Sequence, residues 1–150
     1  MLIEKEIRQK TSFRNEYHRA AVNLIYTGKW LIYKHAKLFE QYHLSLQQYN
    51  VLRILRGRYP ATATIKYIKK RMLDKMSDAS RIVDVLVKRE LISRVQNVKD
   101  RRKVDILILQ NGIDVLNKIE SFNSKMDNFL ASLDTTEVKQ LNQLLDKLRN

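Results

Sequence analysis

The chain of 150 residues has the length of a single domain, and 44% hydrophobic with 30% charged residues is the composition of a protein that builds a core. It contains no cysteine, which excludes a disulfide scaffold, a thiolate zinc site and a cysteine nucleophile. It has no apolar run long enough to cross a bilayer and no signal-peptide pattern at its start. We therefore expect a cytoplasmic protein without a membrane partner.

Positive charge is concentrated in the middle of the chain. The 29 Lys and Arg residues exceed the 16 Asp and Glu residues to give a net charge of +13 at pH 7. Residues 1–65 carry +7 and residues 66–103 carry +8, whereas residues 104–150 carry −2. Such a basic region attracts phosphate backbones through counterion release, and it also attracts an anionic membrane surface. The charge alone does not choose between them.

A long first helix is predicted over about residues 14–44, because the chain has only three Gly and one Pro to interrupt helices. Its apolar positions alternate between spacings of three and four residues, which is typical of a narrow seam that packs on another helix. The seam residues are Ala21, Leu24, Gly28, Leu31, His35, Leu38 and Tyr42.

A second helix is predicted to begin at Ser45. Its hydroxyl can cap the helix, while Gln48, three residues later, reaches back to the cap. Residues 57–60 contain a Gly and the Pro, so they are expected to end this helix.

Two further short helices are expected. The third begins near Thr62 or Thr64, and Asp74 is a candidate cap for the fourth. One face of the fourth helix is apolar and the opposite face is polar. The apolar residues are Ala79, Ile82, Val83 and Leu86.

The apolar period changes to two after Leu91, which indicates strands. Residues 92–96 and 104–109 are the predicted strands, and the polar, basic residues 97–103 form the predicted hairpin tip between them.

The last part of the chain is again helical by its pattern. Gly112 is expected to precede a long amphipathic helix that reaches Leu130. Asp134 and Glu137 form a capping box for the final helix, which carries a second narrow seam. That seam consists of Val138, Leu141, Leu145 and Leu148.

These elements predict a mainly α fold with a small β-hairpin: a winged helix-turn-helix core flanked by long dimerisation helices. We expect one domain over residues 1–150, with the core at about residues 62–109 and the dimerisation helices at about residues 14–44 and 112–150. A helix fits the major groove of DNA, and the short side chains of Ser77 and Ser80 let it approach the base edges. Arg81 can reach guanine in a bidentate manner.

Two segments resemble the MarR family of transcriptional regulators. Residues 77–94, SDASRIVDVLVKRELISR, resemble the recognition helix and first wing strand of that family. Asp100-Arg101-Arg102, followed by residues 107–112, LILQNG, resembles the DRR wing signature ahead of L-T-x-x-G. The similarity extends over roughly Tyr17 to Leu148.

The resemblance implies a homodimer that binds a palindromic operator on double-stranded DNA, as repressor or activator, and that responds to a small aromatic or anionic effector. It implies no cofactor. By position, the recognition-helix residues expected to face the major groove are Ser77, Asp78, Ser80 and Arg81. The DNA-binding wing residues are Lys99, Arg101, Arg102 and Lys103, with Arg101 in the minor groove. Asp100 braces the wing, and Asp78 either accepts from cytosine or stabilises the first turn of its own helix.

The sequence departs from the family pattern at three places. Glu90 occupies the usual position of a Gly that ends the recognition helix in a left-handed conformation, so Glu90 adopts that conformation at a cost or the helix ends differently. Gln110 replaces the usual Thr, and Lys75-Met76 replaces small polar residues. The absence of cysteine excludes the peroxide-sensing mechanism of some relatives.

Aromatic residues on the first long helix form a candidate effector pocket, for which the alternative is ordinary packing. The pocket residues are Tyr26, Trp30 and Tyr33, with His43 and Tyr49 as further members. His18, His35 and His43 are too dispersed to predict a metal site.

Three other functions compete with a regulator. A winged-helix module for non-specific nucleic-acid packaging or for protein contact would have the same fold. A peripheral membrane protein fits the charge but not the polar face of residues 77–81. A small enzyme lacks a phosphate loop, a nucleophile motif and paired carboxylates, so we expect no enzymatic activity.

Overall fold

A computed structural model of the chain describes residues 2–97, 100 and 104–150. In chain order its elements are α1 (Ile3–Glu6), α2 (Glu16–Glu40), α3 (Leu46–Arg56), β1 (Ala63–Thr64), α4 (Ile65–Arg71), α5 (Ala79–Lys88), β2 (Ile92–Gln96), β3 (Val104–Ile108), α6 (Gln110–Glu120), α7 (Asn123–Asp127), a 3-10 turn (Asn128–Leu130) and α8 (Thr135–Arg149). The predicted fold class, mainly helical with a small antiparallel sheet, is confirmed.

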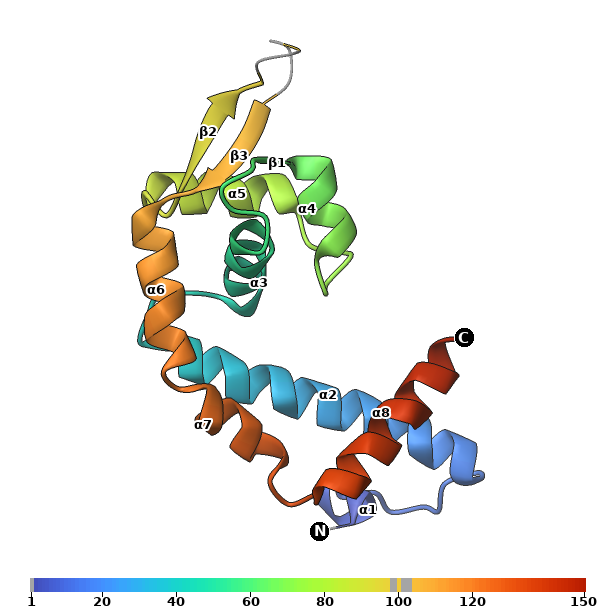
Figure 1. The fold of residues 1–150 in the computed structure, drawn as a ribbon. Helices are drawn as coiled ribbons and strands as arrows, with labels where there is room; N and C mark the ends of the chain where they lie inside the picture. Colours follow the sequence, from blue (N-terminus) through green and yellow to red (C-terminus); the bar gives the residue numbers. More distant parts are fainter. Residues whose placement is uncertain (1, 98–99, 101–103) are drawn as a thin grey trace.

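The elements form two groups at opposite ends of the molecule (Figure 1). Helices α3, α4 and α5 pack beside the sheet, in the order of a winged helix-turn-helix. Helices α1, α2 and α8 lie at the other end, together with both chain termini. Helix α6 runs from the sheet toward α2 and so connects the two groups.

The sheet contains one strand that the sequence did not reveal. Within the described residues its order is β1-β3-β2, with both pairs antiparallel. Ala63 pairs with Ile106 and Thr64 with Asp105, while Ile92 pairs with Ile108. Because β1 has two residues, it is too short to show an alternating pattern. It attaches the start of α4 to the base of the wing.

The buried core belongs to the winged helix-turn-helix and not to the long helices. Phe39, near the end of α2, is the one fully buried residue of that helix, and α8 has none, among the residues described. Leu52, Ile68, Leu86 and Ile106 are all fully buried between α3, α4, α5 and the sheet. The residues of the two predicted seams are half-buried or exposed, and none of them is fully buried by this chain.

Two predicted helix caps are confirmed, and a third cap lies at Thr64, one of the two predicted starts of its helix. Ser45 Oγ accepts from Gln48 N at 3.1 Å, and Gln48 Oε1 accepts from Ser45 N at 3.0 Å. Thr64 caps α4 by accepting from the backbone of Tyr67. At α8, the capping box of an aspartate and a glutamate three residues later is complete. Each cap satisfies backbone N–H groups that a helix start leaves without partners.

Gly112 lies inside the first turn of α6, so the prediction that it precedes the helix is wrong. A Cβ atom at Gly112 would lie 2.3 Å from the Leu91 carbonyl oxygen and 2.9 Å from Ile108 Cγ1. The Leu109 N–H donates to the same Leu91 oxygen at 3.0 Å. Glycine thus permits a close approach between α6 and the backbone that leads into β2.

The prediction of one long helix after Gly112 is also wrong, because α6 ends at Glu120. The Ser121 hydroxyl donates to the Lys118 carbonyl at 2.6 Å, and Phe122 adopts φ −108° and ψ 15°. Ser, Phe and Asn are weak helix formers, and a serine hydroxyl competes for backbone acceptors. This run of residues therefore interrupts the helix before α7 begins.

Candidate nucleic-acid interface

The predicted recognition helix, α5, begins with an aspartate cap. Asp78 Oδ1 accepts hydrogen bonds from Ser80 N at 3.0 Å and from Arg81 N at 3.1 Å. Asp78 was expected either to accept from cytosine or to stabilise its own helix, and these hydrogen bonds give it the second role. Asp78 precedes the helix and does not lie on its outer face.

Asp74, the expected cap, instead fixes the turn between α4 and α5. Its carboxylate accepts from the Ser77 hydroxyl at 2.6 Å and from Met76 N at 3.0 Å. These two hydrogen bonds, Ser77 first, lower the pKa of Asp74 below its ordinary value. Asn50 Oδ1 accepts from Leu73 N at 2.9 Å, which holds the same turn against α3. Ser77 is therefore half-buried in this turn.

The first turn of α5 presents polar side chains to solvent. Ser80 and Arg81 are exposed, whereas Ala79 and Val83 on the opposite face are buried. No hydrogen bond or ion pair within the described part of the chain engages the Arg81 guanidinium. A side chain with five free N–H groups at the start of an exposed helix can reach the edge of a guanine.

The end of α5 is closed by Glu90 in the left-handed conformation, with φ 54°. Its N–H donates to the Val87 carbonyl at 2.9 Å, and the Leu91 N–H donates to the Leu86 carbonyl at 3.1 Å. This is the Schellman pattern that usually places a glycine at this position. Glu90 therefore adopts the left-handed conformation that a glycine usually takes here, and the wing leaves the helix in the usual direction.

Two arginines fix the orientation of α5. The Arg89 guanidinium donates to the backbone carbonyls of Tyr42 and His43, just beyond the end of α2. Arg94 on β2 pairs with Asp84 on α5. About half of the Asp84 side chain stays exposed, so this ion pair orients the wing more than it stabilises the fold.

The base of the wing is held by Asp105 on β3. Its Oδ2 accepts from Thr62 Oγ1 and from Asn97 Nδ2, both at 2.9 Å. Asp100, the predicted brace of the wing, donates its backbone N–H to Asn97 Oδ1 at 2.9 Å. The other predicted wing residues lie outside the described residues; these are Lys99, Arg101, Arg102 and Lys103.

A cluster of cations surrounds α4, next to the recognition helix. Its members are Lys66, Lys69, Lys70, Arg71 and Lys75, and all are exposed. None of them forms an ion pair with a carboxylate in residues 2–97, 100 and 104–150. Unpaired cations beside an exposed helix form a surface suited to a phosphate backbone.

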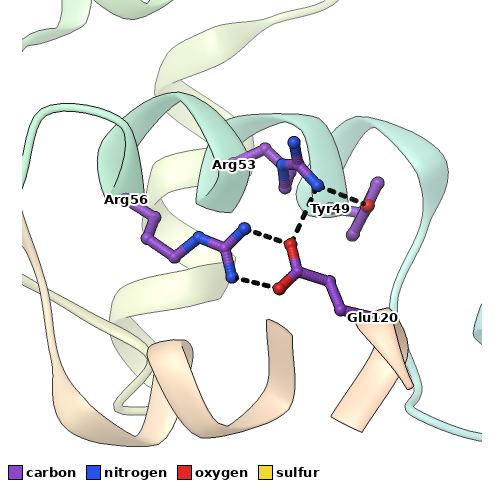
Figure 2. A network of polar contacts seen from close by, with 4 residues as sticks. All are labelled: Tyr49, Arg53, Arg56 and Glu120. Atoms are coloured by element: carbon purple, nitrogen blue, oxygen red, sulfur yellow. Dashed lines mark hydrogen bonds and ion pairs between the residues drawn. The ribbon is translucent and has the colours of Figure 1, made fainter. Parts of the chain in front are cut away.

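A polar network joins α3 of the winged core to the end of α6 (Figure 2). Glu120, the last residue of α6, accepts a bidentate pair of hydrogen bonds from Arg56 and one from Arg53 at 3.0 Å. Arg53 also donates to Tyr49 Oη at 3.4 Å. The Arg56 hydrogen bonds lower the pKa of Glu120 and raise that of Arg56. The network fixes α3 of the winged core to the helix that leads to α2.

The predicted effector residues fall in three separate places. Tyr26 and Trp30 line a cavity of about 270 Å³ between α1 and α2. Tyr33 and His43 line an open one of about 520 Å³ further along α2. Tyr49 stacks on Phe39 with ring centroids 4.4 Å apart. A helix rises about 1.5 Å per residue, so Tyr26 and His43 are too distant to share one pocket.

A different cavity, of about 490 Å³, lies between the long helix α2 and the winged core. Leu31, Ile32 and His35 of α2 form one wall. The rest of its lining comes from α3 and the α4–α5 turn: Leu46, Gln47, Asn50, Met72, Leu73 and Asp74. No periodicity in the sequence indicates this cavity, because three separate elements create it. The same holds for the contacts of Arg89, Asp105 and Glu120.

Comparison with protein families finds a similarity for the winged core of the chain. Residues 44–104 match the MarR family model. The winged core of the chain is thus similar to the MarR family. Comparison with curated proteins gives no match.

Solved structures of MarR-type regulators resemble the fold of this chain over most of its length. A MarR transcription factor from Planctomyces limnophilus is 27% identical, with a TM-score of 0.67, over 92% of this chain and 98% of that one. A mutant of E. coli MarR in complex with operator DNA is 20% identical, with a TM-score of 0.79, over 92% and 99%. An organohalide-sensing regulator, RdhR, bound to 2,4-dichlorophenol is 19% identical, with a TM-score of 0.82, over 95% and 86%.

These similar structures are those of transcription regulators, and one of them is bound to operator DNA. In the described part of this chain, no helix is both long and apolar enough to cross a membrane. No group of three or more His, Asp or Glu residues in that part is arranged to hold a metal ion.

Proposed function

We propose that this protein is a transcription regulator of the MarR family, a cytoplasmic homodimer that binds a palindromic operator. Ser80 and Arg81 read bases in the major groove, Ser77 and Asp78 set the start of the helix against the DNA, and the wing enters the minor groove through Arg101. The observation that carries the proposal is the exposed Arg81 on the first turn of α5, with no partner among the described residues.

The dimer is supported by apolar side chains that this chain leaves uncovered on α2 and α8. Leu24 is 41% exposed and Ile25 61%, while Leu144 and Leu148 on α8 are 65% and 67% exposed. Leucines of α8 and the facing residues of α2 also border a groove of about 440 Å³. A continuous apolar surface of this kind marks a protein interface. A two-fold dimer presents two copies of α5, which requires a site with the same symmetry.

The cavity between α2 and the winged core is the proposed effector site. It adjoins the turn in which Asp74 accepts from Ser77, one residue before the α5 cap, so a molecule that widens it moves the recognition helix. Its walls are mostly apolar, and the carboxylate of Asp74 at its border disfavours an anion. Neutral or cationic aromatic compounds therefore fit better than anionic ones. The effector-bound relative carries a phenol derivative, 2,4-dichlorophenol.

The test is fluorescence-anisotropy binding to the DNA upstream of the protein's own gene and to a scrambled duplex, each across a salt series. A preference of about 10³-fold or more for the upstream DNA supports the proposal. Equal affinity for both duplexes supports the non-specific packaging module instead. Sedimentation equilibrium on the same samples tests the dimer, and a panel of aromatic amines, phenols and carboxylates tests the effector class by release of bound DNA.

A further inference from the structure

Two arginines stack on one tyrosine beside the recognition helix. The Arg71 guanidinium carbon lies 3.6 Å from the centroid of the Tyr67 ring, and the Arg58 guanidinium carbon lies 4.6 Å from it. These three residues form the Arg58–Tyr67–Arg71 stack. Arg58 belongs to the turn after α3, whereas Tyr67 and Arg71 belong to α4, one helical turn apart. The stack therefore joins two elements through a single ring.

The stack leaves its cations available to an anion. Both arginines are exposed, and neither forms an ion pair with a carboxylate within the described ranges 2–97, 100 and 104–150. Arg58 Nε donates to the Thr62 carbonyl, and no other donor group of these two side chains is used in that part of the chain. Stacking occupies the face of a guanidinium and leaves the N–H groups at its edge free to bind oxygen atoms.

Further cations around the stack make this arrangement electrostatically unfavourable unless a polyanion binds to it. The short helix that carries Tyr67 also carries Lys66, Lys69 and Lys70, and all three are exposed. None of these lysines has a carboxylate partner in the described structure. Two guanidinium groups over one ring repel each other, and the negative face of the ring offsets part of that repulsion. A row of phosphates neutralises the rest.

The position of the stack places it at the edge of the candidate nucleic-acid interface. Thr62, which accepts from Arg58, also donates to Asp105 at the base of the wing. Thr64 caps α4 by accepting from Tyr67 N at 3.1 Å and pairs with β3 in the sheet. The stack is thus attached to the wing base on one side and borders α5 on the other.

We propose that Tyr67 is a positioning residue for DNA binding, whose ring holds the guanidinium groups of Arg58 and Arg71 for phosphate groups of the DNA backbone. This inference rests on the proposed function, since it assumes that DNA lies against α5 and the wing. The two arginines add affinity without sequence preference, because phosphate contacts carry no base information.

The test measures binding to the upstream duplex and to a scrambled duplex across a salt series for five variants. R58Q and R71Q are each expected to weaken binding to both duplexes by a similar factor, about tenfold, and to reduce the slope of log K against log [salt] by about 1. Y67L is expected to weaken both duplexes likewise. Y67F, which keeps the ring, is expected to bind as wild type does. K139Q removes an exposed cation from α8 and serves as the matched control with no change.

The coupling between these variants separates positioning from a general structural effect. In a Y67L background, R71Q is expected to cost much less than it does in the wild type, because the ring no longer places the guanidinium. Wild-type affinity and slope for R58Q and R71Q would overturn the proposal, as would additive losses for Y67L and R71Q. If Y67L fails to fold by circular dichroism, the two exposed arginine variants still decide the outcome. If the wild-type protein binds no DNA, the proposed function is overturned. If all variants bind the upstream duplex specifically and as strongly as wild type, only the proposed role of the Arg58–Tyr67–Arg71 stack is overturned.

Discussion

The guanidinium of Arg89, at the end of the recognition helix α5, donates a hydrogen bond of 3.1 Å to the backbone carbonyl of Tyr42, beyond the end of α2. The same guanidinium donates to the carbonyl of His43, which itself adopts the left-handed conformation with φ 53°. A cation at a helix C-terminus satisfies carbonyl groups that lack intrahelical partners. One side chain thus sets the recognition helix against the predicted dimerisation helix.

Removing that link is expected to lower stability. R89Q should reduce the free energy of unfolding by about 1–2 kcal/mol, because hydrogen bonds to a charged group are lost and carbonyl groups at the end of α2 are left without it. Urea unfolding followed by circular dichroism measures the change. K88Q, at the exposed neighbouring position, is the matched control and should stay within about 0.5 kcal/mol of wild type. Equal stability of R89Q and wild type would show that the link contributes nothing.

Glu90 offers a substitution that is expected to stabilise the protein. It holds φ 54° without being a glycine, so E90G removes the left-handed strain while it adds flexibility to the unfolded chain. We expect a net gain of about 0.5–1 kcal/mol in the free energy of unfolding. K88G, placed inside the regular helix, should instead lose about that amount. If urea unfolding shows that E90G loses as much free energy of unfolding as K88G does, the result would contradict the left-handed conformation of Glu90.

Gly112 is expected to tolerate no side chain. In G112A the new methyl group meets the Leu91 carbonyl oxygen at 2.3 Å, and backbone at that distance must move. Overpacking of this kind should cost about 1–3 kcal/mol or more in thermal or urea unfolding. The matched control is G57A, whose new atom has its nearest neighbour at 3.5 Å and should be nearly neutral or slightly stabilising. A neutral G112A would contradict the close approach of α6 to Leu91.

The Glu120 network predicts a dependence of stability on pH. Hydrogen bonds from Arg56 lower the folded-state pKa of Glu120, so its contribution is complete above about pH 5 and is lost as the pH falls through the folded pKa. We expect E120Q to be less stable than wild type by about 1 kcal/mol at pH 7, and the difference to shrink toward pH 3. E16Q, in a pair at 3.5 Å whose glutamate is 85% exposed, should show almost no difference at either pH. A difference for E120Q that does not change with pH would exclude this origin.

Local signals in the sequence predicted the starts of two helices correctly. Ser45 with Gln48 and Asp134 with Glu137 mark helix starts through side-chain chemistry that acts over three residues, and both capping boxes form. The strands around the wing follow from an alternation that burial of one sheet face imposes. The apolar spacing of Ala79, Ile82, Val83 and Leu86 supplied the expectation that Ser80 and Arg81 face outward together.

Several features that the sequence did not reveal depend on tertiary contacts. Strand β1 is defined by its pairing with β3 rather than by its own two residues. Asp74 and Asp78 are both plausible caps by type, and only the path of the turn decides that Asp78 starts α5. The cavity beside Leu31 depends on how α2 lies against α3, and spacing along one helix carries no information about that.

Base reading by Arg81 is the central claim, and one measurement tests it most directly. Binding of wild type and R81A is compared on the upstream duplex and on a set of duplexes that each change one base pair. The account predicts that R81A loses about 1–3 kcal/mol on the upstream duplex and no longer distinguishes one particular base pair in each half-site, while R149A, at the end of α8, behaves as wild type. An R81A variant that is weakened equally on every duplex, with every base preference intact, would contradict the account.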